Sequence, residues 1–187
     1  DTTLKSVMTG KEMALNMIYA REHINMITGM YKSSIIKENN IKFDNNRKYA
    51  EDFTFNIKCL IESKNVKAIE KNLAYYVRWL GSSTHILSLK RLDSYYSNVE
   101  IIKYINEFYG NNEYREIVKA LKEYRIPLSI IGIYIDFCKS KLYENKIREI
   151  IKSEEVVSYL KNFRIRNLNK SNIKYYMLAK GILHCPR

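Results

Sequence analysis

The chain has 187 residues, of which 46% are hydrophobic and 28% charged, and its 32 basic and 20 acidic residues give a formal net charge of +12. This composition excludes a disordered chain, and the most apolar stretch, residues 126–138, is too short to span a bilayer. The three cysteines lie far apart without a CxxC pair, which argues against a structural zinc site or a disulfide scaffold and indicates a reducing, cytoplasmic compartment.

The N-terminal segments predict two helices joined by an extended piece. Residues 9–22 begin with Thr9 as an N-cap and continue with Glu12 and apolar residues near helical spacing, which predicts a helix. Residues 23–40 predict a short strand or extended piece followed by a short helix, and residues 41–49 a polar loop.

The next segment changes from a helical to a β-prone pattern. Phe53, Ile57 and Leu60 follow a helical period, so a helix is expected to begin at Glu51. Residues 65–85 contain short runs of β-prone residues and a Gly-Ser-Ser loop, and they predict two short strands.

The remainder of the chain has a helical pattern. Apolar residues at helical spacing predict two helices separated by an Asn-Asn pair at 111–112. Pro127 is expected to end the second of these and to open an apolar helix that runs to about residue 143. One or two more helices are expected over residues 147–163 and 171–183.

These segments together predict a mostly α fold with a small β component (α+β) in two parts, residues 1–86 and a C-terminal helical domain over residues 87–187. Both parts carry more basic than acidic residues. The charge indicates an anionic partner such as phosphate, nucleic acid or anionic lipid, or it reflects a compositional bias of the whole chain.

Two adjacent carboxylates, Glu51 and Asp52, open the predicted helix. Acids in a first turn are favoured by the helix dipole, so the pair has a purely structural interpretation. The same position has a chemical use, because free N–H groups hold a carboxylate ionised and ready to accept a proton from a hydroxyl group.

The surrounding segments decide between these interpretations. In order, the chain contains GMYKSSIIKENNIKF, KYAEDFTFNIKCLIESKNVKAI and NLAYYVRWLGSST. This series resembles the second half of bacterial family-2 glycosyltransferases, which use nucleotide-sugar donors and have a GT-A fold. The resemblance covers about residues 9–90. It implies a partial, acceptor-side GT-A segment over residues 1–86, followed by the helical domain.

The resemblance also implies roles for individual residues. Asp52 matches the general base that deprotonates the acceptor hydroxyl, and Glu51 would orient the acceptor or support the base. Five more positions match a stretch that binds the donor diphosphate or the acceptor: Tyr76, Arg78, Trp79, Ser82 and Thr84. His85 follows them, where some members of the family place a metal-binding histidine.

Each of these positions also has a structural interpretation. Arg78 suits a diphosphate because a guanidinium pairs with two oxygens at once, but it is equally well explained as a solvated strand end. Ser82 and Thr84 fit a turn, and Trp79 could stack on a sugar or simply anchor a loop.

The sequence departs from the family in one large respect. Its five aspartates, at positions 1, 44, 52, 93 and 136, form no D-x-D motif, and no Gly-rich phosphate loop or βαβ pattern precedes Glu51. The resemblance implies a divalent metal (Mn or Mg) and a nucleotide-sugar for the full enzyme, but neither is expected to bind this chain alone. We therefore expect a C-terminal fragment or a truncated gene product, inactive by itself.

The implied function is sugar transfer by an inverting glycosyltransferase in surface polysaccharide or lipopolysaccharide synthesis. A glycan or lipid-linked acceptor is the expected partner. The basic, Tyr-rich tail is a candidate for resting on an anionic membrane surface, which would place a cytoplasmic protein at the inner face of the membrane. The helical part is also a candidate for forming a homodimer.

Two functions of other classes remain open. One is a non-catalytic interaction module made of the helical part. The other is a basic nucleic-acid-binding protein, which is disfavoured because the charge is spread over both parts and no recognised binding motif is present. We expect no nucleic-acid partner.

Overall fold

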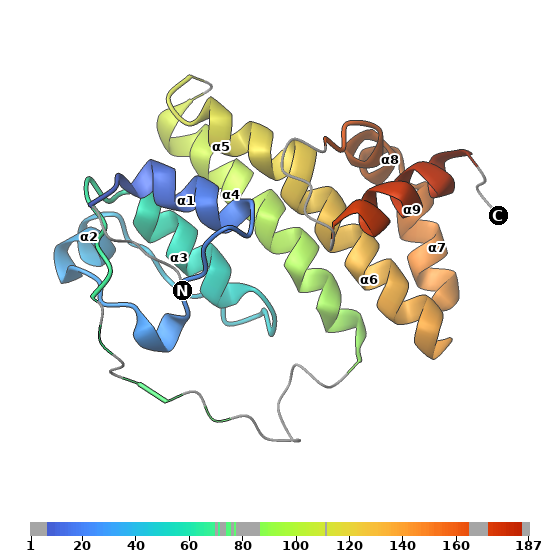
Figure 1. The fold of residues 1–187 in the computed structure, drawn as a ribbon, viewed down its shortest axis with the longest axis horizontal. Coiled ribbons are helices and arrows are strands. Elements are labelled where there is room, and N and C mark those ends of the chain that lie inside the picture. The colour runs from blue at the N-terminus through green and yellow to red at the C-terminus, as the bar shows by residue number, and fades with distance from the viewer. Residues whose placement is uncertain are drawn as a thin grey trace.

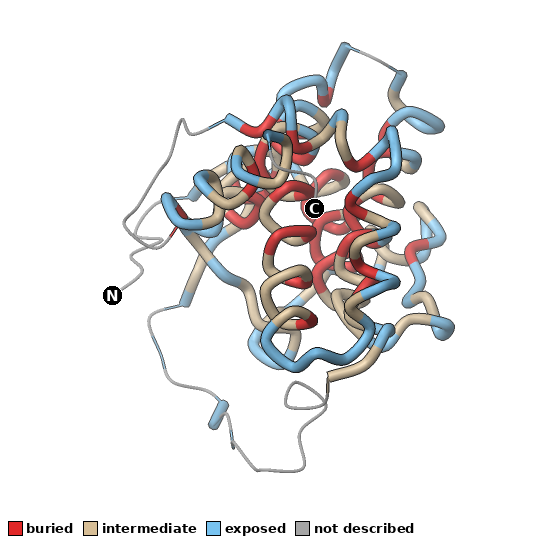
Figure 2. Tube along the Cα trace, turned by 90° about the vertical axis from the view of Figure 1, so that its right-hand side faces the viewer, coloured by how far each residue is buried: buried red, intermediate tan, exposed pale blue. Residues whose placement is uncertain are grey.

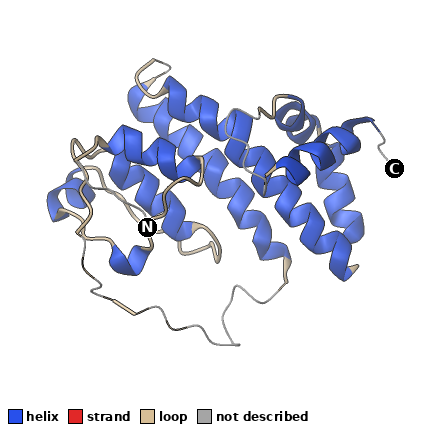
Figure 3. Cartoon of the chain, viewed as in Figure 1, coloured by secondary structure: helices blue, strands red, loops and turns tan. Residues whose placement is uncertain are grey.

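The computed structural model describes residues 7–69, 71, 74, 75, 77, 87–110, 112–164 and 172–184, and these are almost entirely helical (Figure 3). The α-helices are α1 (Gly10–Ile18), α2 (Ser33–Glu38), α3 (Glu51–Ile61), α4 (Asp93–Tyr109), α5 (Arg115–Ala120), α6 (Ile126–Ser140), α7 (Glu144–Lys152), α8 (Glu154–Lys161) and α9 (Ile173–His184). Two short 3-10 turns, Met26–Thr28 and Leu89–Leu92, and a π-helical segment, Leu121–Arg125, complete the described elements.

The expected α+β class is wrong for the described residues, and so is the expected GT-A segment, because these residues contain no sheet. Their β pairing is one isolated bridge, in which Met8 N donates to Val66 O (3.0 Å) and Val66 N donates to Met8 O (2.8 Å). Toward α1 the pairing ends because Thr9, the next residue after Met8, already caps that helix. The rest of the two predicted strands falls largely outside the described residues.

Pro127 does not end a helix as expected. The chain stays helical from α5 through the π-helical segment into α6, and Pro127 lies in the first turn of α6. A proline ring collides with the carbonyl four residues earlier in a regular α-helix. The wider π turn directly before Pro127 relieves this collision, so the helix continues instead of breaking.

Helices α4, α5 and α6 form the centre of the molecule, with α1 and α3 packed on one side and α7, α8 and α9 on the other (Figure 1). One hydrophobic cluster runs through them, from Met13 in α1 to Ala179 in α9. Buried residues accordingly line the inner faces of the helices (Figure 2). The cluster draws on both sides of the predicted boundary at residues 86–87, and that boundary stays a prediction.

A close approach between α1 and α3 occurs where α1 begins and α3 ends. Thr9 caps α1 through a capping box with Glu12, as its sequence predicts. At the next residue, Gly10, an added Cβ would overlap the carbonyl oxygens of Leu60 and Ser63. Only glycine lets α1 begin this close to the end of α3.

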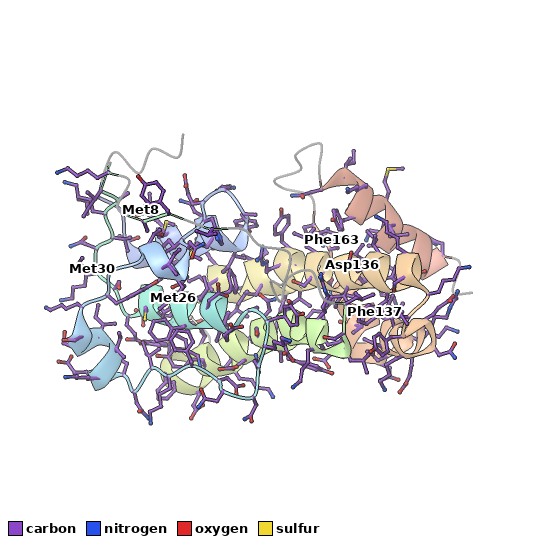
Figure 4. All side chains as sticks on the ribbon, turned by 90° about the horizontal axis from the view of Figure 1, so that it is seen from below. Met8, Met26, Met30, Asp136, Phe137 and Phe163 are labelled. Carbon is purple, nitrogen blue, oxygen red and sulfur yellow. The ribbon has the colours of Figure 1, made fainter. Side chains whose placement is uncertain are left out.

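A smaller apolar cluster covers the opposite face of α3. Phe55 and Cys59 of α3 pack with Ile41, and Met26 and Tyr31 lie against them. Burial raises the pKa of the Cys59 thiol to about 11, with a smaller contribution from the charge of Glu62, so Cys59 behaves as a core residue. Figure 4 shows Met26 at this end of the molecule, far from Phe137 in α6.

Candidate functional site

The backbone at Ala50 determines where the acidic pair lies. Ala50 adopts a left-handed conformation (φ 61°, ψ 17°) and provides no side-chain cap for α3. Asp52 instead accepts a hydrogen bond from the N–H of Phe53 at its Oδ1 (2.7 Å). Its carboxylate therefore lies among the free N–H groups of the first turn, at the positive end of the helix dipole.

The loop before Ala50 is held by α4. Arg47 Nη2 forms an ion pair with Glu100 Oε2 (2.9 Å), and Lys48 N donates a hydrogen bond to Asp93 Oδ2 (2.9 Å). Both acceptors belong to α4, so a helix of the second half of the chain fixes the approach to the acidic pair.

Asp52 lines a cleft of about 340 Å³, and Glu51 does not. This volume is in the range of small-molecule sites. The lining comes from the end of α1 and the following turn, from the start of α3, and from the residue before α6: Met17, Ala20, Arg21, Glu22, His23, Ile24, Ala50, Asp52, Phe53, Asn56 and Arg125.

Arg125, directly before α6, lines this cleft together with a second arginine, Arg21. Its guanidinium carbon lies 4.6 Å from the centre of the Phe53 ring, and its Nε is buried without a hydrogen-bond partner. Burial lowers the pKa of Arg125, although the neighbouring Tyr124 acts in the opposite direction. An unpaired buried donor costs stability, so Arg125 is poised to gain from an anionic ligand.

Asn56 fixes the wall of the cleft beside Asp52. Its Nδ2 donates to Ile24 O (3.1 Å), and its Oδ1 accepts a short hydrogen bond from the Tyr31 hydroxyl. Burial raises the pKa of Tyr31 to about 12, with smaller contributions from Cys59 and Asp52. Tyr31 therefore stays a neutral donor, and the turn after α1 is tied to α3.

Sequence reasoning found Asp52 but missed Arg125, His23 and Asn56 as cleft residues. Arg125 lies in the run LKEYRIPLSII, which was interpreted only as core pattern. The available signal was a charged residue two positions before Pro127, at the edge of the apolar stretch 126–138. No sequence motif marks His23, and its place in the lining with Asp52 depends on how the turn after α1 meets α3.

The other predicted site residues lie outside the described part of the chain: Tyr76, Arg78, Trp79, Ser82, Thr84 and the candidate metal ligand His85. Their proximity to Asp52 stays a prediction. Within the described ranges, no group of three or more His, Cys, Asp or Glu side chains is arranged to hold a metal ion. Among the same residues, no helix combines the length and the apolar character needed to cross a membrane.

The chain is similar to the poly(ribitol-phosphate) beta-N-acetylglucosaminyltransferase TarP of Staphylococcus aureus (strain N315), with 31% identity over 172 residues. The match covers 82% of this chain and 52% of the relative, so the chain spans about half the length of that protein. No family model matches the chain, and no solved structure matches it significantly. The similarity relates the chain to glycosyltransferases.

Proposed function

We propose that this relative of a glycosyltransferase is the acceptor-side part of an inverting enzyme that adds a sugar to a cell-surface polymer, with Asp52 as the general base. The observation that supports this proposal is the position of the Asp52 carboxylate, at the N-terminus of α3 and on the wall of an open cleft. The similarity to a transferase that is named for a polymeric acceptor supports the same class of reaction.

In this proposal Asp52 acts while the acceptor oxygen attacks the anomeric carbon. The carboxylate takes the proton of the hydroxyl group, the bond to the nucleoside diphosphate breaks, and the sugar is transferred with inversion in one displacement. The N-terminus of α3 places this carboxylate at the positive end of the helix dipole. Glu51 supports the acceptor side only from outside the cleft, since it is absent from the lining.

The donor side lies beyond the residues that the structure describes. The metal ion that the family resemblance implies finds no ligand set of His, Cys, Asp or Glu in the described ranges, and no step above depends on it. The proposed donor contacts remain Arg78 and its neighbours. The chain alone is proposed to bind acceptor without transferring sugar.

We assign Arg125 to a phosphate group of the acceptor. The relative's name specifies a poly(ribitol-phosphate) acceptor, and a guanidinium is well suited to a phosphodiester. Arg125 shares the cleft with Asp52, its Nε lacks a partner, and no carboxylate among the described residues forms an ion pair with it. A phosphate bound there would bring a hydroxyl of the same polymer unit toward Asp52.

The test separates acceptor binding from chemistry. Calorimetry with a short ribitol-phosphate oligomer measures binding to the chain and to two variants, Arg125→Gln and Asp52→Asn. We expect Arg125→Gln to weaken binding by about tenfold or more, because a charge-assisted contact is worth about 1.5–3 kcal/mol. Asp52→Asn should bind as well as the wild type. Arg164→Gln, at a charged position outside the cleft lining, is the matched control.

Turnover is then measured in a chimera that joins this chain to the donor-side half of the relative. Asp52→Asn should lower the rate by about 10²–10⁴-fold, the contribution of general base catalysis. Glu51→Gln is the control and should have a smaller effect. Undiminished turnover in Asp52→Asn would contradict the proposal and would leave the acidic pair with only a structural role in the first turn of α3.

A further inference from the structure

A three-residue turn between α6 and α7 exposes apolar side chains at one end of the molecule. Lys141 and Tyr143 both have left-handed backbones (φ 57° and 60°). Between them, Leu142 is 52% exposed and Tyr143 is 40% exposed. Left-handed conformations are uncommon for residues other than glycine, asparagine and aspartate, so this turn has an unusual, sharply defined shape.

The turn is fixed to the core. The Tyr143 ring packs against Phe137, with 5.4 Å between ring centres, and Phe137 is fully buried. Ser140 Oγ donates to Phe137 O (3.0 Å) and accepts from Leu142 N (3.2 Å). The Leu142 side chain is therefore exposed by a structured turn.

Basic side chains surround this leucine. Lys139, Lys141 and Lys146 are all exposed. The acids of α7 are already paired within the helix, Glu144 with Arg148 (2.7 Å) and Glu149 with Lys146 (3.0 Å). Lys139 and Lys141 form no ion pair with any residue that the structure describes, so their charge is uncompensated.

We propose that this tip, made of Lys139, Lys141, Leu142, Tyr143 and Lys146, docks on the surface of an anionic lipid bilayer. Lysines near such a surface are attracted to acidic headgroups, and an exposed leucine gains from insertion at the headgroup boundary. Tyrosine is enriched at the same depth. The tip therefore provides both interactions that hold a peripheral protein on a membrane, electrostatic attraction to the headgroups and insertion of an apolar side chain.

Two other occupants fit the tip less well. A nucleic acid would satisfy the lysines but would leave Leu142 without an apolar partner, since its phosphates face outward. A second copy of the chain, in a two-fold contact through this turn, would place the two sets of lysines against each other. Of these three occupants, the anionic bilayer alone complements both the charge and the apolar side chains.

Docking of the tip also limits the distance between the cleft and the lipid surface. The significance of this distance is the one consequence that rests on the proposed function. Helix α6 begins directly after Arg125 in the cleft and ends at Ser140, directly before the tip (Figure 1). Its 15 residues span roughly 22 Å at 1.5 Å per residue. The cleft would therefore lie no farther than about that distance from the lipid along α6, within reach of a polymer that is anchored in the same bilayer.

Co-sedimentation with vesicles tests the docking on the chain as it stands. Vesicles of phosphatidylcholine alone are compared with vesicles that also contain phosphatidylglycerol. We expect binding only to the anionic vesicles, and we expect it to weaken with salt. In Lys139→Gln/Lys141→Gln, binding should fall by about twenty-five-fold, since each lysine contributes about fivefold. Leu142→Ser should reduce it by roughly tenfold.

The matched control is Lys64→Gln/Lys67→Gln, which removes the same charge from exposed positions just after α3. An equal loss in both double variants would overturn the proposal in favour of diffuse charge. So would absence of vesicle binding at low salt, equally tight binding to a nucleic acid duplex, or a self-associated state that Leu142→Ser dissociates. Asp52→Asn should bind vesicles like the wild type, so failure of the proposed function leaves this result unchanged.

Discussion

Arg47 ties the loop before α3 to α4, and we expect Arg47→Met to lower the free energy of unfolding by about 2–3 kcal/mol. Its Nε pairs with Asp44 (2.9 Å), its Nη2 with Glu100 (2.9 Å), and its Nη1 donates to Ser97 Oγ (2.9 Å). The side chain is only 17% exposed. One hydrogen bond and two partly buried ion pairs, at about 1 kcal/mol each, give this magnitude.

The contact between Arg47 and Glu100 is close but does not have the geometry of a hydrogen bond, because Glu100 Oε2 has no hydrogen-bond partner. Lys58 remains on Glu100 (2.6 Å) when Arg47 is removed. These two facts keep the expected loss below the larger values that are typical of fully buried ion pairs. Methionine preserves the packing of the aliphatic stem, so the change isolates the polar contacts.

Urea unfolding followed by circular dichroism measures the effect, and the melting temperature should fall by about 5–10 °C. Lys11→Met is the control, because Lys11 pairs with Glu116 at the surface (3.1 Å) and should cost less than about 0.5 kcal/mol. A double-mutant cycle with Glu100→Gln should show coupling of about 1 kcal/mol. A loss in Arg47→Met no larger than the control would mean that α4 does not position the approach to Asp52.

Two further predictions concern packing and pH. Gly10→Ala should destabilise by about 1–3 kcal/mol in the same urea assay, because the new Cβ overlaps Leu60 O and Ser63 O, whereas Gly181→Ala meets nothing within 4 Å and should be neutral or stabilising. Equal effects would mean that α1 can shift away from α3. Burial, and then hydrogen bonding to Glu62, raises the pKa of Tyr104 and Tyr109 in the folded state. The folded chain thus holds these protons more tightly than the unfolded chain, so stability should be unaffected by them below about pH 10 and should fall above it. Glu62→Gln should flatten that alkaline loss, and an unchanged slope would contradict the assignment.

The helices were predictable where an apolar stripe and a cap agreed. Helix α1 has both the Thr9 capping box and a buried stripe, and α3 begins at Glu51 as expected. The predicted strand near Val66 was wrong because β propensity describes a residue that fits a sheet and does not supply a partner strand. Met8 pairs with Val66 once before α1 begins, and a single bridge is all that results.

Of the residues that line the candidate cleft, only Asp52 was predicted from the sequence as a site residue. Asp52 was found because its neighbours in sequence carry the family pattern. Arg125 lies 73 positions after Asp52 in the sequence. The packing of α1 against α5 and of α3 against α4 brings Arg125 to the same cleft as Asp52. A contact of that kind has no local signature. Charged residues inside apolar runs are the feature to examine when such a cleft is sought from sequence.

The π-helical segment Leu121–Arg125 changes the direction in which the side chains of α6 point relative to those of α5, within one continuous helix. One extra residue in a turn offsets the following helix by about 100° relative to regular α geometry. The buried stripe of α5 can thus face α1 while that of α6 faces α9, without a loop between them. The same offset gives Arg125 its direction. Deletion of one residue here would rotate α6 relative to α5, so that residues now buried in α6 would become exposed. The guanidinium of Arg125 would then point away from Asp52.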